Sequence, residues 1–361
     1  ELPFPGVVHS HKVAVIGSGP AGLSCAHFLL RAGIGVDMYE RSDEPGGLLA
    51  FGIPNFKLDK GIVRRRFEIL EKAGLRLHLD CEVGREVDFE ALLESHAAVF
   101  LGVGATGGRL PHLAHEGHGN VFRAMEFLTE VQHELEGQDL APRFNVRDKK
   151  VVVIGGGDTA MDCVRTAVRE GAESVTCLYR RDPSNMPGSH KEYQNAQEEG
   201  VNFLFHRAPT EIIVDQRDGR LIGVEVLHTR LDGLAADGRH RVENIPDTEH
   251  CIPAEVLILA LGFDVEEFPF LQQAGVATDG RRATVAYTDK VEEDAHRRDF
   301  TVNALYASRD GVVLDPTGEG LADLKARRIR FIGDPHDRIV EDYLRILRFF
   351  RFHAHYADPG L

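Results

Sequence analysis

A glycine-rich turn near the amino terminus has the spacing of a dinucleotide-binding site. Residues 17–22 read Gly-Ser-Gly-Pro-Ala-Gly and follow an apolar, β-branched run at residues 12–16. In such a turn the first glycine allows the bend, the second lets the backbone approach a pyrophosphate, and the third lets a helix pack on the strand. Glu40 lies 23 residues after Gly17, where a carboxylate accepts hydrogen bonds from an adenosine ribose. The alternative is a structural glycine turn with Glu40 as a solvated strand end.

A second turn, Gly-Gly-Gly-Asp-Thr-Ala at residues 155–160, follows a similar run at 150–154. The next strand-like run ends in Arg180 and Arg181, the former 25 residues after the first glycine of the turn. Two guanidiniums at this place can form paired hydrogen bonds with a 2′-phosphate, which favours NADP(H) over NAD(H). An ordinary surface arginine pair is the alternative. The candidate NADPH contacts are Gly155, Gly156, Gly157, Asp158, Thr159, Ala160, Arg180 and Arg181.

Each turn needs a strand before it and a helix after it, and the flanking residues provide both. Apolar residues predict helices that run to about Ala32 and Gly171, buried strands at 97–103 and 255–261, and a hairpin over Glu211–Leu231 that turns at Asp218-Gly219. The fold class is therefore α/β, with two Rossmann-like dinucleotide-binding domains.

Composition excludes several functions. The net charge of −15 rules out a global basic field for nucleic acid, so any RNA contact must be local. The five cysteines are scattered without a CxxC pair, which indicates reduced thiols and a cytoplasmic protein. No run approaches the roughly 20 apolar residues that span a bilayer, so we expect no membrane association.

Several motifs over residues 11–272 resemble the glutamate synthase small subunit family. They are Gly17–Gly22, Pro45–Leu49, Phe51–Leu58, Val151–Cys163, Leu178–Arg181, Asn185–Gly188 and Ala260–Phe263. The resemblance implies an electron-input subunit that passes hydride from NADPH to FAD and serves the glutamate synthase large subunit or another electron acceptor. It implies FAD contacts at Gly17, Gly19, Pro20, Ala21, Gly22, Glu40, Arg41, Gly47, Leu48 and Val83. No side-chain acid or base is needed, because the cofactors carry the chemistry.

The same resemblance implies that the NADPH domain interrupts the FAD domain. The family returns to the FAD domain through a Gly-Val-Phe-Ala-Ala-Gly-Asp strand and a helix, which residues 264–361 lack in recognisable form. We therefore expect an incomplete FAD domain at 1–146, an NADPH domain at 147–263, and a separate small α+β segment with a long terminal helix at 264–361.

The last segment resembles the CCA-adding tRNA nucleotidyltransferase and poly(A) polymerase family over about residues 276–359. Three blocks carry this resemblance: Glu292–Tyr306, Asp315–Leu324 and Glu341–Phe352. It implies that Asp342 and Arg345 pair with an incoming base. The triphosphate would be held by Arg298, Arg348 and Arg351. The alternative is an amphipathic helix whose arginine face is simply exposed to solvent.

The family's metal-binding aspartates lie upstream of these blocks, where this chain has flavoprotein sequence, so no metal ligand is assigned. Mg²⁺ is expected only if the tail is an active nucleotidyltransferase, with tRNA as a possible partner. The sequence thus favours an NADPH-dependent flavin oxidoreductase. Two alternatives remain: a tRNA nucleotidyltransferase-like or poly(A) polymerase-like RNA-processing protein, and a non-catalytic nucleotide-binding fusion.

Overall fold

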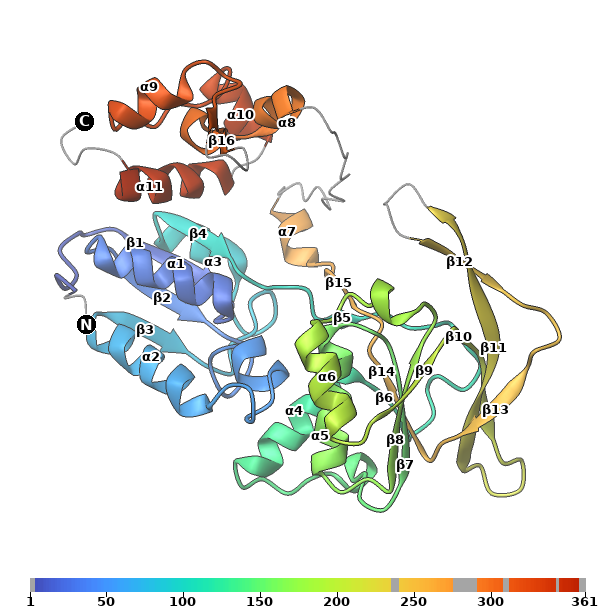
Figure 1. Ribbon diagram of the computed structural model, residues 1–361. Coiled ribbons are helices and arrows are strands. Elements are labelled where there is room, and N and C mark those ends of the chain that lie inside the picture. The colour runs from blue at the N-terminus through green and yellow to red at the C-terminus, as the bar shows by residue number, and fades with distance from the viewer. Residues whose placement is uncertain (1–3, 235–239, 275–290, 308–311, 342–343, 357–361) are drawn as a thin grey trace. The chain divides into compact units, whose positions relative to one another are not determined.

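The computed structural model describes residues 4–234, 240–274, 291–307, 312–341 and 344–356. The chain forms two compact units, Glu1–Arg281 and Arg282–Leu361 (Figure 1). The first unit holds two parallel sheets, which confirms the α/β class. No helix among the described residues is both long enough and apolar enough to cross a membrane.

The amino-terminal sheet has four parallel strands in the order β3-β2-β1-β4. Its strands are β1 (Lys12–Ile16), β2 (Gly35–Tyr39), β3 (Leu75–His78) and β4 (Ala98–Leu101). Its helices are α1 (Pro20–Arg31), α2 (Lys60–Lys72) and α3 (Phe89–Ser95). Successive residues of β1 serve different cores, as the period of two in a strand requires. Val15 packs with α1 and α2, whereas Ile16 packs with α3.

The expected boundary at residue 264 differs from the structure, in which the units divide at Arg281 and Arg282. Helix α7 (Pro269–Gln273) shows why, because Leu271 is buried in one core with Ile16 and Phe89. The chain therefore returns to the first domain after the second one. Within the described residues, β4 pairs with β1 alone, and Leu101 on β4 is 37% exposed.

The second sheet has five parallel strands in the order β6-β14-β7-β8-β9. They are β6 (Val121–Arg123), β7 (Lys150–Ile154), β8 (Ser174–Tyr179), β9 (Asn202–Phe205) and β14 (Val256–Leu259). One face packs on α4 (Ala124–Leu135), α5 (Asp158–Arg169) and α6 (His190–Glu198). Strand β6 and helix α4 precede the expected boundary at 147. Because Phe122 and Phe127 are buried with the rest of this core, they belong to the second domain.

An antiparallel sheet covers the other face of the second sheet. It is built from β10 (Arg207–Val214), β11 (Leu221–Leu234), β12 (His240–Asn244) and β13 (His250–Pro253). Strands β10 and β11 form the predicted hairpin, with Gly219 at φ +71° in the turn. The hairpin prediction is confirmed.

The two crossings between the domains run side by side. Strand β5 (Gly107–Gly108), on the way out, pairs antiparallel with β15 (Phe263–Asp264), on the way back. The second domain is thus inserted into the first, as the sequence predicted.

The carboxy-terminal unit is a small α+β structure around Ala295, Ala304 and Ile332. Its elements are α8 (Val291–Arg297), β16 (Tyr306–Ala307), β17 (Val313–Leu314), α9 (Gly320–Lys325), α10 (Pro335–Glu341) and α11 (Leu344–Tyr356). Residues 301–303 form a 3-10 turn that precedes β16. The long terminal helix is found as α10 and α11.

Candidate functional site

The first glycine turn is fixed by close backbone contacts. Gly17 has φ +91°, and a Cβ there would lie 2.5 Å from the carbonyl oxygen of Gly102. A Cβ at Gly22 would lie only 1.9 Å from the oxygen of Gly17. Gly19 precedes α1 and has open space where a Cβ would be. The turn therefore leaves its free amide edge and the helix N-terminus available to an anion.

Ser18 links this turn to the end of β2. Its amide donates to Oε2 of Glu40 at 2.9 Å, and its hydroxyl donates to the same oxygen at 2.5 Å. The amide of Gly46 donates to the Ser18 hydroxyl at 2.8 Å. Glu40 is 7% exposed, and its other oxygen accepts the amide of Ser42. The carboxylate is thus oriented before any ligand binds. Ser18 was missed as a site residue, although it lies inside the glycine motif.

A pocket of about 1100 Å³ opens along this turn. Its volume lies slightly above the ~300–1,000 Å³ typical of ligand pockets, which leaves room for an extended dinucleotide. The structure brings nine of the ten predicted FAD contacts into its lining: Gly17, Gly19, Pro20, Ala21, Glu40, Arg41, Gly47, Leu48 and Val83. Gly22 packs beneath the turn instead. The open cradle at Gly19, the oriented carboxylate and the volume all fit FAD.

Arg41 is held at the rim of this pocket. Its guanidinium donates to the Thr106 hydroxyl at 2.9 Å and to Glu266 at 3.1 Å. The hydrogen bond from Thr106, together with Arg41, lowers the pKa of Glu266. Thr106 and Glu266 come from the two crossings between the domains. Their participation could not be predicted, because they are 160 residues apart in the sequence.

The far end of the pocket is lined from both domains. Gly47, at φ +52°, precedes a π-helical turn, η1 (Leu48–Gly52), which supplies Leu48 and Phe51. Helix α4 of the inserted domain supplies Met125, Glu126, Thr129, Glu130 and His133. The His133 ring packs edge-on against Phe51 at 5.6 Å. A group bound beside η1 would therefore face the second domain.

The second glycine turn repeats the backbone packing of the first. A Cβ at Gly155 would lie 2.3 Å from the oxygen of Ala260, and one at Gly156 would lie 2.5 Å from the Tyr179 ring. Gly157 precedes α5 and has open space beside it. Asp158 and Thr159 start the helix, and Ala160 is fully buried. This turn also presents a free helix N-terminus.

The two predicted arginines lie at the end of β8. Arg180 is exposed. Arg181 is half-buried, and its Nε donates to the carbonyl of His240 at 3.0 Å. The hydroxyl of Thr229 fixes the backbone between strands by donating to the carbonyl of Arg180 at 2.8 Å. Both residues thus directly follow β8, and their contact with a ribose 2′-phosphate stays a prediction.

The tail arginines contact protein groups in the carboxy-terminal unit. Arg298 lies over the Tyr306 ring and donates to the Asn303 carbonyl at 3.0 Å. Arg348 pairs with the buried carboxylate of Asp299. Burial alone would raise the pKa of Asp299, but the hydrogen bonds from Arg348 and Asn303 lower it below its usual value.

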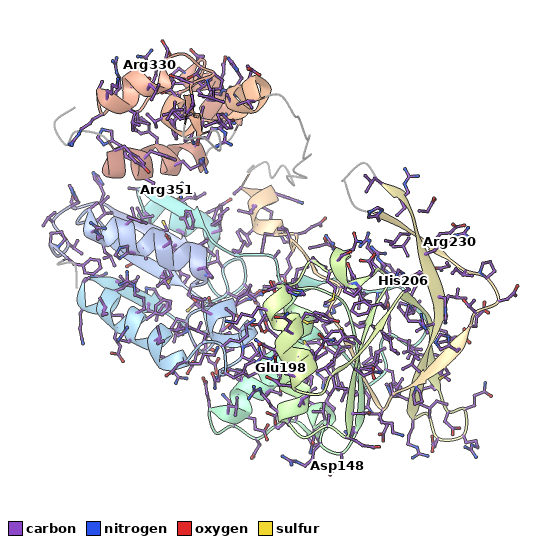
Figure 2. The ribbon with its side chains drawn as sticks, viewed as in Figure 1. Asp148, Glu198, His206, Arg230, Arg330 and Arg351 are labelled. Atoms are coloured by element: carbon purple, nitrogen blue, oxygen red, sulfur yellow. The ribbon has the colours of Figure 1, made fainter. Side chains whose placement is uncertain are left out.

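Two further tail arginines lie on α11. Arg345 donates to the Arg338 carbonyl at 2.9 Å. Arg351, labelled in Figure 2, has its guanidinium carbon 5.3 Å from the centroid of the Phe352 ring. Asp342 lies outside the described residues. The assignment of this set to a nucleotide stays a prediction.

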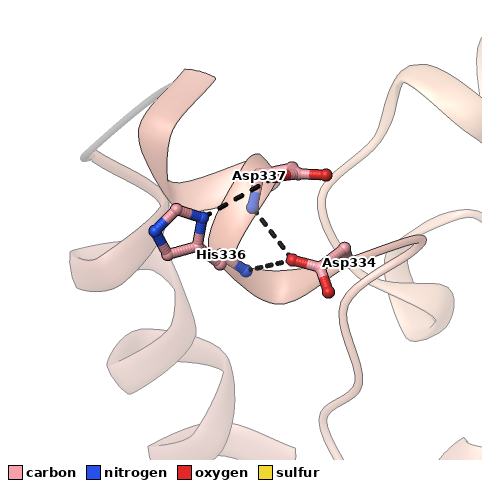
Figure 3. Close-up of side chains that lie close together, drawn as sticks. All are labelled: Asp334, His336 and Asp337. Atoms are coloured by element: carbon pink, nitrogen blue, oxygen red, sulfur yellow. Dashed lines mark hydrogen bonds and ion pairs between the residues drawn. The ribbon is translucent and has the colours of Figure 1, made fainter.

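Three exposed side chains near the start of α10 lie close together (Figure 3). Asp334 accepts the amides of His336 at 2.9 Å and Asp337 at 3.1 Å, which caps the helix. Capping accounts for this arrangement, because Asp is a preferred N-cap residue. The conditional expectation of Mg²⁺ gains no support from it.

The fold consists of two domains, each with a parallel sheet and a glycine-rich turn that opens at a helix N-terminus. The chain belongs to the pyridine nucleotide-disulphide oxidoreductase family, whose model matches residues 11–293. A second family model, the poly A polymerase head domain, matches residues 259–330. The expected resemblance of the last segment to the poly(A) polymerase family is thereby confirmed over the residues that this model matches.

Curated relatives agree with the family assignment. The glutamate synthase [NADPH] small chain of Escherichia coli (strain K12) is 44% identical over 76% of this chain and 59% of its own length. The same chain of Halomonas elongata is 43% identical over 83% of this chain and 63% of its own. The NADPH-Fe(3+) oxidoreductase subunit beta of Geobacter sulfurreducens is 37% identical over 70% of this chain and 37% of its own. The chain thus spans less than two thirds of the length of these relatives.

Solved structures show the same fold. FprA from Mycobacterium tuberculosis, in complex with NADPH, superimposes with a TM-score of 0.61 at 18% identity, over 71% of each chain. Lactococcus lactis thioredoxin reductase gives a TM-score of 0.53 at 20% identity, over 75% of this chain and 83% of its own.

Proposed function

We propose that this chain is an NADPH-dependent flavin oxidoreductase that holds FAD at the first turn and NADPH at the second. When both are bound, a hydride leaves the nicotinamide of NADPH and reduces the flavin, which leaves NADP⁺ and reduced FAD. The observation that carries the proposal is the pocket of about 1100 Å³, which runs from the Gly17 turn to α4 of the inserted domain. It gives a flavin a place bordered by the domain that carries the second turn.

The chain's own residues orient the ligands in this proposal. Glu40 accepts the ribose hydroxyls of FAD, and the amide edge near Gly19 meets its pyrophosphate. Arg180 and Arg181 hold the 2′-phosphate of NADPH. Leu48, Phe51 and His133 line the end of the pocket that borders α4.

The electron acceptor is proposed from the relatives. Two of them are named as small chains of glutamate synthase, so we propose a large subunit of that enzyme as partner. An Fe(3+)-reducing assembly is the alternative, because another relative carries that name. Mixing the purified chain with each acceptor and following NADPH oxidation separates the two.

The test of the main proposal is the visible spectrum of the purified chain, reconstituted with FAD and then mixed anaerobically with NADPH. We expect a bound flavin spectrum that bleaches with NADPH and bleaches far more slowly with NADH. A chain that retains no flavin, or a bound flavin that NADPH leaves oxidised, would contradict the proposal.

The carboxy-terminal unit supports a second candidate function. We propose that it binds a nucleotide through Arg298, Arg345, Arg348, Arg351 and Asp342, because the poly A polymerase head model matches part of this unit. Incorporation of CTP or ATP into tRNA in the presence of Mg²⁺ tests whether it also transfers nucleotides. If the unit retains nucleotide but incorporates none into tRNA, its function is nucleotide binding without transfer.

A further inference from the structure

The loop at residues 54–58 is part of the first domain, but two of its side chains contact the second domain. It joins η1 to α2. Leu58 packs in the core of the first sheet, and Asp59 caps α2 by accepting the amide of Gly61 at 2.8 Å. Between these anchors, Phe56 and Lys57 contact helices of the inserted domain.

Lys57 forms the polar part of this contact. Its Nζ lies 2.8 Å from Oδ1 of Asp162 on α5 and 3.4 Å from Oε2 of Glu192 on α6. The Asp162 side chain is only 8% exposed. Burial raises the pKa of Asp162, whereas Lys57 opposes that shift by favouring the carboxylate. The ammonium of Lys57 is thus the partner of a buried carboxyl group across the domain boundary.

The contact is extended within the second domain. Arg165 on α5 donates to Glu192 at 2.7 Å and to Glu199 at 2.7 Å. The Phe56 ring lies under the guanidiniums of Arg165, at 4.5 Å, and Arg169, at 4.2 Å. Phe56 and Lys57 of the loop therefore contact a set of charged residues on α5 and α6 that are paired with one another.

Both ends of this connection adjoin a proposed nucleotide site. η1, immediately before the loop, lines the large pocket with Leu48 and Phe51. α5 begins at the second glycine turn, and Asp162 lies one turn into it. A buried ion pair is weak evidence for stability, because the cost of desolvation offsets its attraction, but a well-hydrogen-bonded one can fix geometry.

We propose that Lys57 and Asp162 are positioning residues that fix the distance and angle between the two nucleotide sites. This proposal rests on the proposed function. Hydride transfer depends steeply on geometry, since a displacement of about 1 Å can cost on the order of a hundredfold in rate. Loss of the ion pair between Lys57 and Asp162 should therefore slow flavin reduction, while each site still binds its own nucleotide.

The test compares Lys57→Met with Lys12→Met in the FAD-reconstituted full chain. Lys12 is a matched control, because it pairs with the buried Asp37 at 2.5 Å but within one domain. Rapid mixing with NADPH gives the limiting rate of flavin reduction and the apparent Kd for NADPH. Hydrogen exchange of the FAD-loaded chain, without NADPH, reports directly on residues 48–58, α5 and α6.

We expect Lys57→Met to lower the limiting rate on the order of tenfold or more. Its apparent Kd for NADPH should be nearly unchanged, and exchange should rise over 48–58 and α5. Lys12→Met should change neither the rate nor the exchange of those segments, and Lys57→Arg should restore part of the rate. Equal behaviour of Lys57→Met and Lys12→Met, or an unchanged rate and exchange in Lys57→Met, would overturn the proposal.

Lys57→Met alone leaves a buried carboxyl group without its cation and can lower stability. The double variant Lys57→Met/Asp162→Asn removes both charges and should recover thermal stability while the reduction rate stays low. Recovery of the wild-type rate in the double variant would contradict the positioning role. If NADPH does not reduce the flavin of the wild-type chain, the proposed function is contradicted. Hydrogen exchange then still tests whether the Lys57–Asp162 ion pair connects the two domains.

Discussion

The two glycine turns use the same packing. The first glycine of each lies against a carbonyl of another strand end, so that a Cβ would meet Gly102 at 2.5 Å in one case and Ala260 at 2.3 Å in the other. The glycine before each helix has open space beside it. A second loop approaches each turn, Gly47 on the first and Gly188 on the second.

The turns differ in the residues at the end of the next strand, which we propose to contact the ribose. The strand after the first turn ends at a buried carboxylate, Glu40, already held by Ser18. The strand after the second ends in Arg180 and Arg181. The comparison teaches that one backbone packing serves both turns. Under the proposed function this shared backbone binds the pyrophosphate, and the side chains at the next strand end select the nucleotide.

The largest expected effect comes from the third position of each motif. Gly22→Ala should destabilise the chain by about 3 kcal/mol, because the added methyl meets a backbone oxygen and forces overpacking. The reciprocal change, Ala160→Gly, should cost only about 1 kcal/mol, from the lower helix propensity of glycine. Thermal unfolding followed by circular dichroism compares them. Equal costs would show that the two turns are packed alike at this position.

The arginine pair should decide nucleotide preference. Arg180→Gln/Arg181→Gln should lower the preference for NADPH over NADH on the order of a hundredfold, since a hydrogen bond to a charged group contributes about 1.5–3 kcal/mol. Steady-state kinetics with both nucleotides measure the ratio. Arg230→Gln is the control, because Arg230 forms an exposed ion pair with Glu243 on the antiparallel sheet (Figure 2). An unchanged ratio in the double variant would refute the assignment.

Glu40→Gln should weaken FAD retention on the order of tenfold, because an amide replaces a charged acceptor of both the Ser18 amide and the ribose. Its effect on NADPH affinity should be small. Equilibrium dialysis of FAD gives the affinity, and the exposed Glu90→Gln serves as control. Wild-type FAD affinity in Glu40→Gln would count against the first turn as the flavin site.

The smallest expected effect is a difference in how the stability contributions of Asp37, paired with Lys12, and Asp162, paired with Lys57, depend on pH. Burial raises the pKa of Asp37, but hydrogen bonds from Lys12 and His96 lower it below the usual value. Its contribution to stability is therefore complete above the unfolded pKa of about 3.9 and is lost as pH falls through the folded pKa. The pKa of Asp162 is raised in the folded state, so the effect runs in the opposite direction. The contribution of Asp162 to stability is complete below the unfolded pKa of about 3.9 and is lost as pH rises through the folded pKa.

Urea unfolding between pH 3 and 6 measures this contrast. The stability of wild type relative to Asp37→Asn should increase with pH, whereas that relative to Asp162→Asn should decrease. Parallel curves for the two variants would show that the pairs have the same electrostatic environment.

Local patterns predicted the parts of the molecule that depend on neighbouring residues. The glycine turns, the strands before them and the hairpin at Asp218-Gly219 all follow from short motifs. The start of the second sheet at Val121 could not be predicted, because β6 is only three residues long. The pairing of Lys57 with Asp162 joins residues 105 positions apart and leaves no local signal.

The most direct test of the central claim is a crystal structure of the chain with FAD and NADP⁺ bound. We predict the adenosine ribose of FAD on Glu40, its pyrophosphate at the Gly17 turn, and the 2′-phosphate of NADP⁺ between Arg180 and Arg181. Electron density for FAD at the second turn, or for the 2′-phosphate away from both arginines, would contradict the account.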